Sequence, residues 1–245
     1  MDETPLTQAD ILYRGSGLVA VNKPAGMPVH SSRILEDRPR TLLQMTRVHQ
    51  GALMHAVHRL DRPVSGVNLF ASDRDVLAQM SRKFEERRVK KCYLAVVRGW
   101  LAEDGVIDHP IRPPRDVRKP GAVARSAVTR FERIARIETA FPVTPYATSR
   151  YSLLALYPET GRRHQLRMHM KHISHHLVGD TTYGRGEHNQ LFRERFNCSR
   201  LLLHAWSLEF AHPVSGQRVR IEAPLDACFR TVIERFSWQD AIAHR

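Results

Sequence analysis

The chain has 245 residues, 42% of them hydrophobic, which is enough to bury a sizeable core as one large domain or two small ones. No apolar run approaches the ~20 residues that a membrane-spanning helix needs, and the N-terminal MDETPLTQAD is unlike a signal peptide, so we expect a cytoplasmic protein without membrane attachment. The 38 Lys and Arg outnumber the 25 Asp and Glu, and the net charge of +13 favours a polyanionic partner such as RNA or DNA.

The first ninety residues predict a sheet with two helices. Residues 11–23, ILYRGSGLVAVNK, predict two short strands around an RGSG turn. TLLQMTRVHQ, from Thr41, predicts a short helix, and VNLFA predicts a buried strand. Ser72 and Asp75 form an approximate capping box for a second helix. The apolar face of that helix carries Val76, Leu77, Met80 and Phe84.

The second part of the chain continues with strands and two helices. KKCYLAVVRGW predicts a strand, and residues 112–125, with five basic residues and three prolines, predict an exposed basic loop that is either solvated or in contact with nucleic acid. TSRYSLLALYPETG predicts a strand and a turn, and HQLRMHMKHI a helix. SRLLLHAWSLEF and QRVRIEA flank AHPVSG as a late hairpin. A final amphipathic helix carries Leu225, Phe229, Ile233 and Phe236.

These elements predict the fold class. Strands outnumber helices and are often joined by turns of hairpin length, which favours one α+β domain on a largely antiparallel or mixed sheet with flanking helices. We expect this catalytic domain at residues 11–236, between a polar N-terminal tail at 1–10 and a C-terminal tail at 237–245.

The cysteine spacing and the motifs that the sequence lacks limit the cofactors that we expect. Cys92, Cys198 and Cys228 are far apart and form no CxxC pair, so we expect reduced, structural thiols rather than a zinc site or disulfides. The sequence contains no Walker A loop, GxGxxG or GxSxG motif. We therefore expect no ATP, NAD or flavin cofactor.

The segment HRLDRPVSG, residues 58–66, contains the first candidate for chemistry. Arg59 and Arg62 flank Asp61 and favour its ionised form. The Pro-Val-Ser-Gly that follows predicts a constrained turn that holds the carboxylate exposed. An ionised carboxylate can act as a nucleophile, a general base or a charge stabiliser. A structural salt bridge is the alternative.

A second candidate lies in the predicted helix after residue 162. Arg163, Arg167 and Lys171 recur every four residues, and like charges at this spacing repel unless an anion lies opposite, either a carboxylate or a phosphate. Histidines also crowd this segment, but their spacing lacks the HExxH pattern of a metal site. We expect them to face RNA or cap the core, and we expect no metal. They are His164, His169, His172, His175 and His176.

Three motifs, HRLDRPVSG, KKCYLAVVRG and TGRRHQLRMHM, occur in this order and resemble the RluA-type pseudouridine synthase family. The likeness extends from LVAVNKPAGMPVHSS through HLVGDTTYG to SRLLLHAWSLEFAHPVSG. It implies a pseudouridine synthase fold and the isomerisation of uridine to pseudouridine within RNA, without a cofactor or metal. We expect a monomer without an obligate protein partner. NKPAGMPVHSS, TSRY and FNCSRLLLHA look most like a subgroup that acts on the acceptor or T-arm region of tRNA. We expect no separate RNA-binding domain upstream.

The resemblance also implies roles for individual residues. Asp61 matches the family's catalytic aspartate, which either adds to the sugar or base or removes the 2′ proton. Arg167 matches the arginine that pairs with this acid, and Tyr93 the tyrosine that stacks on the target base. Arg59 matches the side chain that enters the RNA stack where the base has been flipped out. Val64 stands where the family usually has threonine.

Other choices stay open in the sequence. The expected RNA contacts are His58, Arg59, Arg62, Arg163 and Lys171. The same chemistry would serve a ribosomal RNA substrate, and a catalytically idle RNA-binding factor would have the same charge. We expect loops at 112–125 and 184–197 to govern the choice of substrate.

Overall fold

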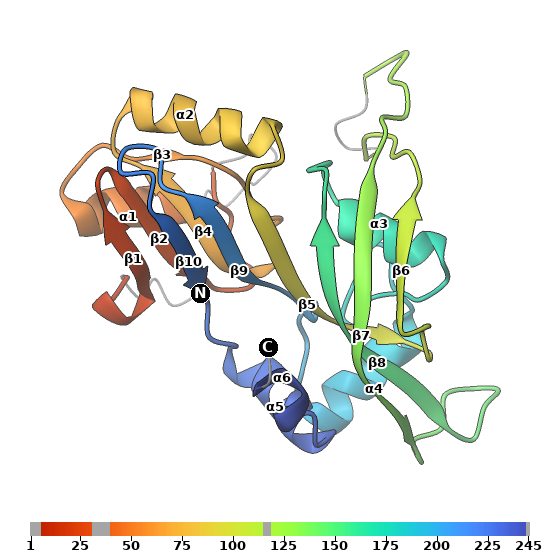
Figure 1. Cartoon of the computed structure of the whole chain (residues 1–245). Coiled ribbons are helices and arrows are strands. Elements are labelled where there is room, and N and C mark those ends of the chain that lie inside the picture. The colour runs from red at the N-terminus through yellow and green to blue at the C-terminus, as the bar shows by residue number, and fades with distance from the viewer. Residues whose placement is uncertain (1–5, 31–39, 115–118, 244–245) are drawn as a thin grey trace. The chain divides into compact units, whose positions relative to one another are not determined.

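The computed structural model describes residues 6–30, 40–114 and 119–243, which fall into two compact units (Figure 1). The first unit comprises Met1–Lys91 and Ala205–Pro224, and the second comprises Cys92–His204 and Leu225–Arg245. The chain passes from one unit to the other within the strands β5 (Lys90–Arg98) and β9 (Leu203–Ala211). The helices of the described residues are all too short or too polar to cross a membrane. The domain boundaries expected at 11 and 236 stay a prediction.

The first unit is built on an antiparallel sheet. Strand β2 pairs with β1 on one side and β4 on the other, β3 also pairs with β4, and β10 pairs with β9. The elements of this unit are the 3-10 helix η1 (Gln8–Asp10), β1 (Ile11–Gly15), β2 (Leu18–Lys23), α1 (Leu42–Gln50), β3 (His55–Ala56), β4 (Ser65–Ala71), α2 (Arg74–Glu85) and β10 (Arg218–Glu222).

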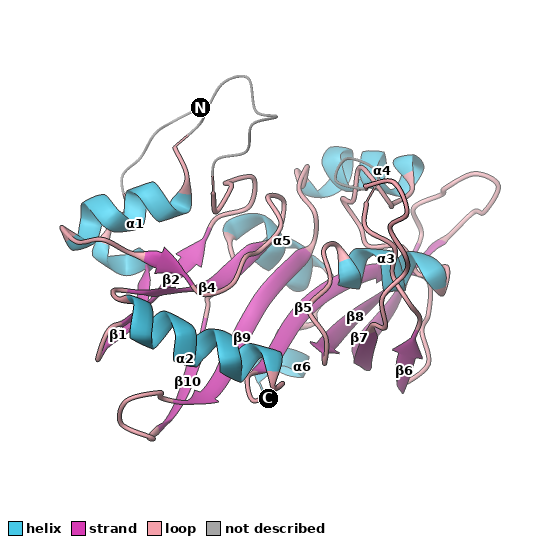
Figure 2. Ribbon diagram, turned by 90° about the horizontal axis from the view of Figure 1, so that it is seen from above, coloured by secondary structure: helices cyan, strands magenta, loops and turns pink. Residues whose placement is uncertain are grey.

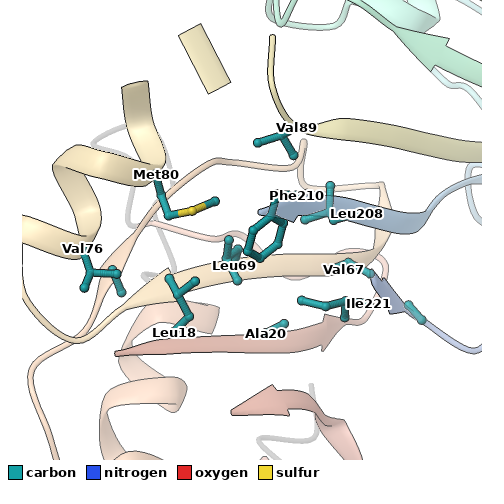
Figure 3. Packing of buried hydrophobic residues seen from close by; sticks show 12 residues of the cluster. Leu18, Ala20, Val67, Leu69, Val76, Met80, Val89, Leu208, Phe210 and Ile221 are labelled. Carbon is teal, nitrogen blue, oxygen red and sulfur yellow. The ribbon is translucent and has the colours of Figure 1, made fainter. Parts of the chain in front are cut away.

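Helices α1 and α2 cover opposite faces of this sheet (Figure 2). Because successive side chains of a strand point to opposite faces, Leu18 and Ala20 pack with α2, whereas Val19 and Val21 pack with α1. Figure 3 shows the α2 side, where Met80 contributes to a cluster with residues of β2, β4, β9 and β10. Strands buried on both faces therefore read as continuous apolar runs, as LVAV does.

The first turns of α1 and α2 show how local sequence fixes these helices. Thr41 caps α1, accepting from the Gln44 N–H, while the Gln44 side chain accepts from the Thr41 N–H. The predicted cap of α2 at Ser72 is wrong, because Asp73 is the N-cap and its Oδ1 accepts from the N–H groups of Asp75 and Val76.

The second unit is also antiparallel, with the strand order β5, β8, β7, β6 (Figure 1). Its other elements are β6 (Asp104–Asp108), β7 (Val128–Thr139), β8 (Ser149–Pro158), α3 (Gln165–His172), α4 (Gly186–Phe196), α5 (Ala227–Arg235) and α6 (Gln239–Ala243). The predicted class, α+β on a largely antiparallel sheet with flanking helices, is confirmed.

Two expectations for this unit are wrong. Residues 186–196 form α4 rather than a loop, because Leu191, Phe192 and Phe196 are buried on one side of a helix. The expectation of reduced cysteines also fails, since Cys198 and Cys228 are joined in a disulfide with a Cα–Cα distance of 5.5 Å. This bond links the residues that follow α4 to the first turn of α5. Cys92 is buried and is not part of this bond. Of the expected 112–125 loop, residues 115–118 lie outside the described residues.

Candidate active site

Asp61 lies on a tight turn directly before β4. The turn closes with a hydrogen bond of 3.0 Å from the Val64 N–H to the Asp61 carbonyl. Leu60 and Val64 are buried on either side, whereas Asp61 itself is partly exposed. Val64, at the position where threonine was expected, thus contributes an apolar side chain to the core. The two buried neighbours anchor the turn, so the carboxylate is held at a defined place.

The buried Lys23 ties this turn to the loop that follows β2. Its Nζ donates to the carbonyls of Pro24, Met27 and Arg62, at 2.9, 2.7 and 3.0 Å. An ammonium group carries three N–H donors, so each donor has a carbonyl acceptor. Lys23 has no solvent exposure, and a buried charge is stable only when it is hydrogen-bonded in this way. Sequence reasoning did not identify this clamp, in which Lys23 and Arg62 lie 39 positions apart.

The two arginines beside Asp61 have different surroundings. Arg62 Nε donates to the Gly26 carbonyl at 2.8 Å, and the Gly26 N–H donates to the Arg62 carbonyl at 2.9 Å. Arg62 therefore helps to clamp the turn onto the same loop. Arg59 is exposed. Burial, together with the charge of Arg59 and of Arg47, lowers the pKa of His30, which places these three side chains in one basic neighbourhood.

His58 is held inside the first unit. Its Nε2 accepts from the Leu69 N–H at 3.1 Å, and its ring stacks on Phe84 with a centroid distance of 5.1 Å. Burial, with a smaller effect from Lys91, lowers the pKa of His58 to about 3. The ring is thus neutral at physiological pH and connects the segment that precedes Asp61 to β4 and α2. A contact of His58 with RNA stays a prediction.

Gly66 lies in strand β4 and not in the turn that the sequence predicts for Pro-Val-Ser-Gly. It pairs with Lys23 in the sheet and has a φ of +109°, and a Cβ here would lie 2.1 Å from the Ala205 carbonyl oxygen. Glycine is therefore required by the close approach of β9 and by the backbone conformation. The turn itself lies at 61–64.

Tyr93 and Arg167 lie in the second unit. Tyr93 is partly buried on β5, in register with Leu156 of β8. Arg167 is on α3 and is only 5% exposed. Its Nε and Nη2 donate to Oδ2 and Oδ1 of Asp180, each at 2.8 Å, in a two-bond pair. The anion that the cationic spacing predicts opposite Arg167 is thus present within this unit as Asp180.

Asp180 is a site residue that sequence reasoning missed. Its Oδ1 also accepts from the N–H groups of Thr182 and Tyr183, each at 2.9 Å. Burial raises the pKa of Asp180, but the hydrogen bond and charge of Arg167 and the two backbone donors outweigh burial and hold this pKa below its usual value. The carboxylate is therefore ionised and fixes Arg167. Its position in HLVGDTTYG was the available signal, because this segment was part of the family likeness.

The same turn contributes an aromatic ring to the basic helix. The Tyr183 ring lies beneath Arg167 and Lys171, at 5.0 and 5.8 Å from their charged groups. The Tyr183 hydroxyl is 2.9 Å from His164 Nδ1. Arg163 precedes the first residue of α3, so the three cations do not form one helical stripe. Lys171 is exposed on the helix.

The crowded histidines bind protein groups. His169 Nδ1 lies 2.9 Å from Thr129 Oγ1 and its Nε2 lies 3.0 Å from the His109 carbonyl. The Nδ1 atoms of His175 and His176 each lie within hydrogen-bond distance of a backbone carbonyl oxygen. Within the ranges that the structure describes, no group of three or more His, Cys, Asp or Glu side chains could hold a metal ion. These rings connect α3 and its neighbours to the sheet.

The structure thus builds two halves of a candidate site. One half holds Asp61 on a clamped turn with Arg59 exposed beside it, and the other holds Arg167 on Asp180 above Tyr183. Because the halves belong to different units, the expected contacts of Asp61 with Arg167 and Tyr93 stay a prediction. A fixed carboxylate and a fixed guanidinium group suit a reaction in which charge develops at a defined atom.

Comparison with known proteins places these residues in a family context. A family model described as RNA pseudouridylate synthase matches residues 17–172. The tRNA pseudouridine synthase C of Haemophilus ducreyi is 44% identical over 238 residues, which cover 94% of this chain and 97% of that protein. The tRNA pseudouridine synthase C of Vibrio cholerae is 41% identical, over 95% of this chain and 98% of that protein.

Solved structures give the same result for the fold. Human RNA pseudouridylate synthase domain containing 4 matches with a TM-score of 0.68 and 25% identity, covering 93% of this chain and 92% of its own. Human RNA pseudouridylate synthase domain containing 1 also has a TM-score of 0.68 and 25% identity, and covers 96% and 98%.

Proposed function

Because the chain belongs to the RNA pseudouridylate synthase family, we propose that it converts uridine to pseudouridine in tRNA. The observation that carries this proposal is the turn of Asp61, which the buried ammonium of Lys23 clamps while Arg59 stays exposed beside it. The tRNA pseudouridine synthases C that resemble this chain over almost its whole length support tRNA as the substrate.

The reaction moves one bond of the nucleoside. The bond from uracil N1 to ribose C1′ breaks, the base turns, and C5 bonds to C1′. The hydrogen at C5 leaves to solvent and N1 gains a proton, so atoms and electrons balance without an oxidant or reductant. The protein then has to supply position and electrostatic stabilisation.

Asp61 begins the reaction in this proposal. It attacks the sugar or the base, or it removes the 2′ proton, and both routes need an ionised carboxylate at a fixed place. Arg59 enters the space that the flipped uridine leaves in the RNA stack, and Tyr93 stacks on the extruded base. Arg62 and Lys23 act as positioning residues, because their hydrogen bonds hold the backbone of the turn.

Arg167 pairs with Asp61 in this proposal, and Asp180 positions Arg167. A guanidinium group has five N–H donors, and the two bonds to Asp180 use one on Nε and one on Nη2. Arg163 and the exposed Lys171 then contact phosphates of the RNA, as does the basic surface in general.

The experiment is tritium release from tRNA transcripts labelled at C5 of uridine. The proposal predicts release from one uridine in the acceptor or T-arm region, located by mapping pseudouridine in the product. Release from ribosomal RNA alone would assign the same chemistry to another substrate. Binding of tRNA without release from any RNA would instead identify a catalytically idle RNA-binding factor.

The proposal has the chain acting as a monomer in the cytoplasm, with tRNA as its partner and without an obligate protein partner. Sedimentation of the purified protein with and without tRNA tests the first part. A one-to-one complex is expected, and a stable dimer that dissociates only with loss of activity would contradict it.

A further inference from the structure

A pocket of about 670 Å³ lies entirely within the second unit, away from Tyr93. Arg98, Arg150 and Arg185 line it, together with His188 and residues of the 143–149 segment between β7 and β8. Arg98 is the last residue of β5 and Tyr93 lies five positions earlier on the same strand. At about 3.3 Å per residue, the pocket lies roughly 17 Å along β5 from Tyr93.

The pocket carries unneutralised positive charge. Arg150 is paired with Glu138, with Nε 3.2 Å from Oε2. Among the described residues, no side-chain hydrogen bond or ion pair engages the guanidinium group of Arg98 or Arg185. Glu187 is the acid in the lining, so the charges of Arg98 and Arg185 exceed it. Such a pocket attracts an anion that accepts several hydrogen bonds, as a phosphate does.

His188 adds a neutral donor to this pocket. Its Nδ1 lies 2.9 Å from the hydroxyl of Tyr151, which is fully buried. Burial and then the charge of Arg98 lower the pKa of His188 to about 4, and burial raises the pKa of Tyr151 to about 12. Both groups are therefore neutral at pH 7. With Tyr151 as the donor to Nδ1, the imidazole keeps its own proton on Nε2 and offers an N–H.

One aromatic side chain lines the pocket, and another lies beside one of its arginines. Tyr146 is 68% exposed and lines the pocket. Trp100 is 38% exposed, with Arg150 at 4.3 Å and Arg136 at 5.0 Å from its ring centroid. Proteins recognise unpaired nucleotides by stacking bases on exposed aromatic rings and by binding the backbone with Arg and Lys. The rim and the interior of this pocket offer both features.

We propose that this pocket is a second RNA-binding site, which holds the phosphate of one nucleotide on Arg98 and Arg185 and stacks its unpaired base on Tyr146. The choice of RNA over an acidic peptide rests on the proposed function and on the exposed aromatic ring. Because the pocket is distant from Tyr93 along β5, the nucleotide is not the target uridine. The site therefore contributes to affinity and to the choice of RNA, not to bond breaking.

This assignment gives a function to a segment that the sequence singled out. Residues 184–197 were expected to govern the choice of substrate, and Arg185, Glu187 and His188 come from this segment. The start of α4 and the 143–149 segment meet at the pocket, so a change in either would alter the RNA that binds there.

The test compares two variants with a matched control. Arg98→Gln/Arg185→Gln should raise KM and the Kd for the tRNA transcript on the order of tenfold at low salt while leaving kcat unchanged. The slope of log Kd against log salt should fall by about 0.7, because one phosphate contact is lost. Arg230→Gln removes the same kind of charge from the exposed face of α5 in the same unit. It should change Kd less than twofold.

A second pair of variants tests the base. Tyr146→Ala should raise Kd on the order of tenfold, because base stacking is lost, whereas Tyr146→Phe keeps the ring and should bind as wild type. Tyr146 is exposed, so substitutions of this residue should keep the fold. Circular dichroism checks whether the double arginine variant is folded. If it is not, Arg185→Gln alone replaces the double variant.

The proposal is overturned if Arg98→Gln/Arg185→Gln and Tyr146→Ala bind tRNA with the wild-type Kd and salt slope. It is also overturned if these variants keep tRNA binding but lose binding of a polyglutamate peptide, which would identify a peptide site. Measuring Kd for the same pocket substitutions in the Asp61→Asn background separates failure of this proposal from failure of the proposed function. If the pocket substitutions weaken RNA binding in that background, the pocket is supported whether or not the wild-type protein makes pseudouridine.

Discussion

Arg167 and Asp180 form a buried ion pair through two hydrogen bonds of 2.8 Å, although they lie 13 residues apart in the sequence. The side chains are 5% and 1% exposed. Removing one member leaves the other charge without its partner in the interior, which destabilises a protein by about 3–5 kcal/mol. The pair therefore fixes the guanidinium group, and breaking it should destabilise the second unit.

The first prediction follows from this pair. Asp180→Asn should lower the free energy of unfolding by about 3 kcal/mol or more in urea titrations, and should reduce kcat because Arg167 loses its fixed orientation. Glu86→Gln, which removes ion pairs with the exposed side chains of Arg82 and Arg88, should change the free energy of unfolding by less than about 1 kcal/mol. Equal, small effects of the two substitutions would contradict the assigned function of Asp180.

The second prediction concerns the clamp on the turn of Asp61. Lys23→Met keeps the length of the side chain but removes the donors of three carbonyls, and each buried acceptor left without a partner is unfavourable by about 1–3 kcal/mol. We expect a loss of stability on the order of 3–5 kcal/mol and a lower kcat at temperatures where the variant is folded. Lys90→Met, at a lysine that is 76% exposed, is the control and should be near wild type. Retention of full kcat by folded Lys23→Met would show that the clamp does not position Asp61.

The third prediction is a pH dependence from His58. Its pKa is about 3 in the folded protein and near 6.5 when unfolded, so the unfolded state binds the proton first as the pH falls. The stability contributed by neutral His58 is complete above pH 6.5 and is lost as the pH falls toward 3, by up to about 1.4 kcal/mol per pH unit. In NMR titrations the His58 ring signals should not move between pH 8 and pH 5. A midpoint near 6.5 would contradict its burial against Phe84.

The fourth prediction concerns the disulfide. The Cys198–Cys228 bond closes a segment of 30 residues, and in the chain-entropy model a loop of this size stabilises the folded state by about 3–4 kcal/mol. A reductant should lower the free energy of unfolding of the wild type by this amount and leave Cys228→Ser unchanged. If both proteins respond equally to reductant, the bond does not form in solution.

Sequence reasoning predicted the elements whose signals are local. The strand pair at 11–23, the helix that begins near Thr41 and the helix of Arg167 depend on neighbouring residues, and the structure has them. The likeness to the RluA-type family, and within it to tRNA pseudouridine synthase C, is confirmed by the comparisons. Asp61 stood out because two arginines adjoin it in the sequence.

The features that sequence reasoning missed depend on contacts between distant residues. Lys23 reaches Arg62 across 39 positions, and Cys198 reaches Cys228 across 30. No local pattern encodes such a pairing. Strand β7 has an alternating pattern that sequence reasoning did not identify. Helix α4 has few apolar residues, and its three buried side chains, Leu191, Phe192 and Phe196, are too few to predict a helical period.

The most direct measurement is tritium release from tRNA labelled at C5 of uridine by the wild type, Asp61→Asn and Asp75→Asn. Both substitutions remove one carboxylate from the first unit, and Asp75 is an exposed residue of α2. We expect normal release by the wild type and Asp75→Asn, and none by Asp61→Asn, which should still bind tRNA. Release by Asp61→Asn at the wild-type rate would contradict it.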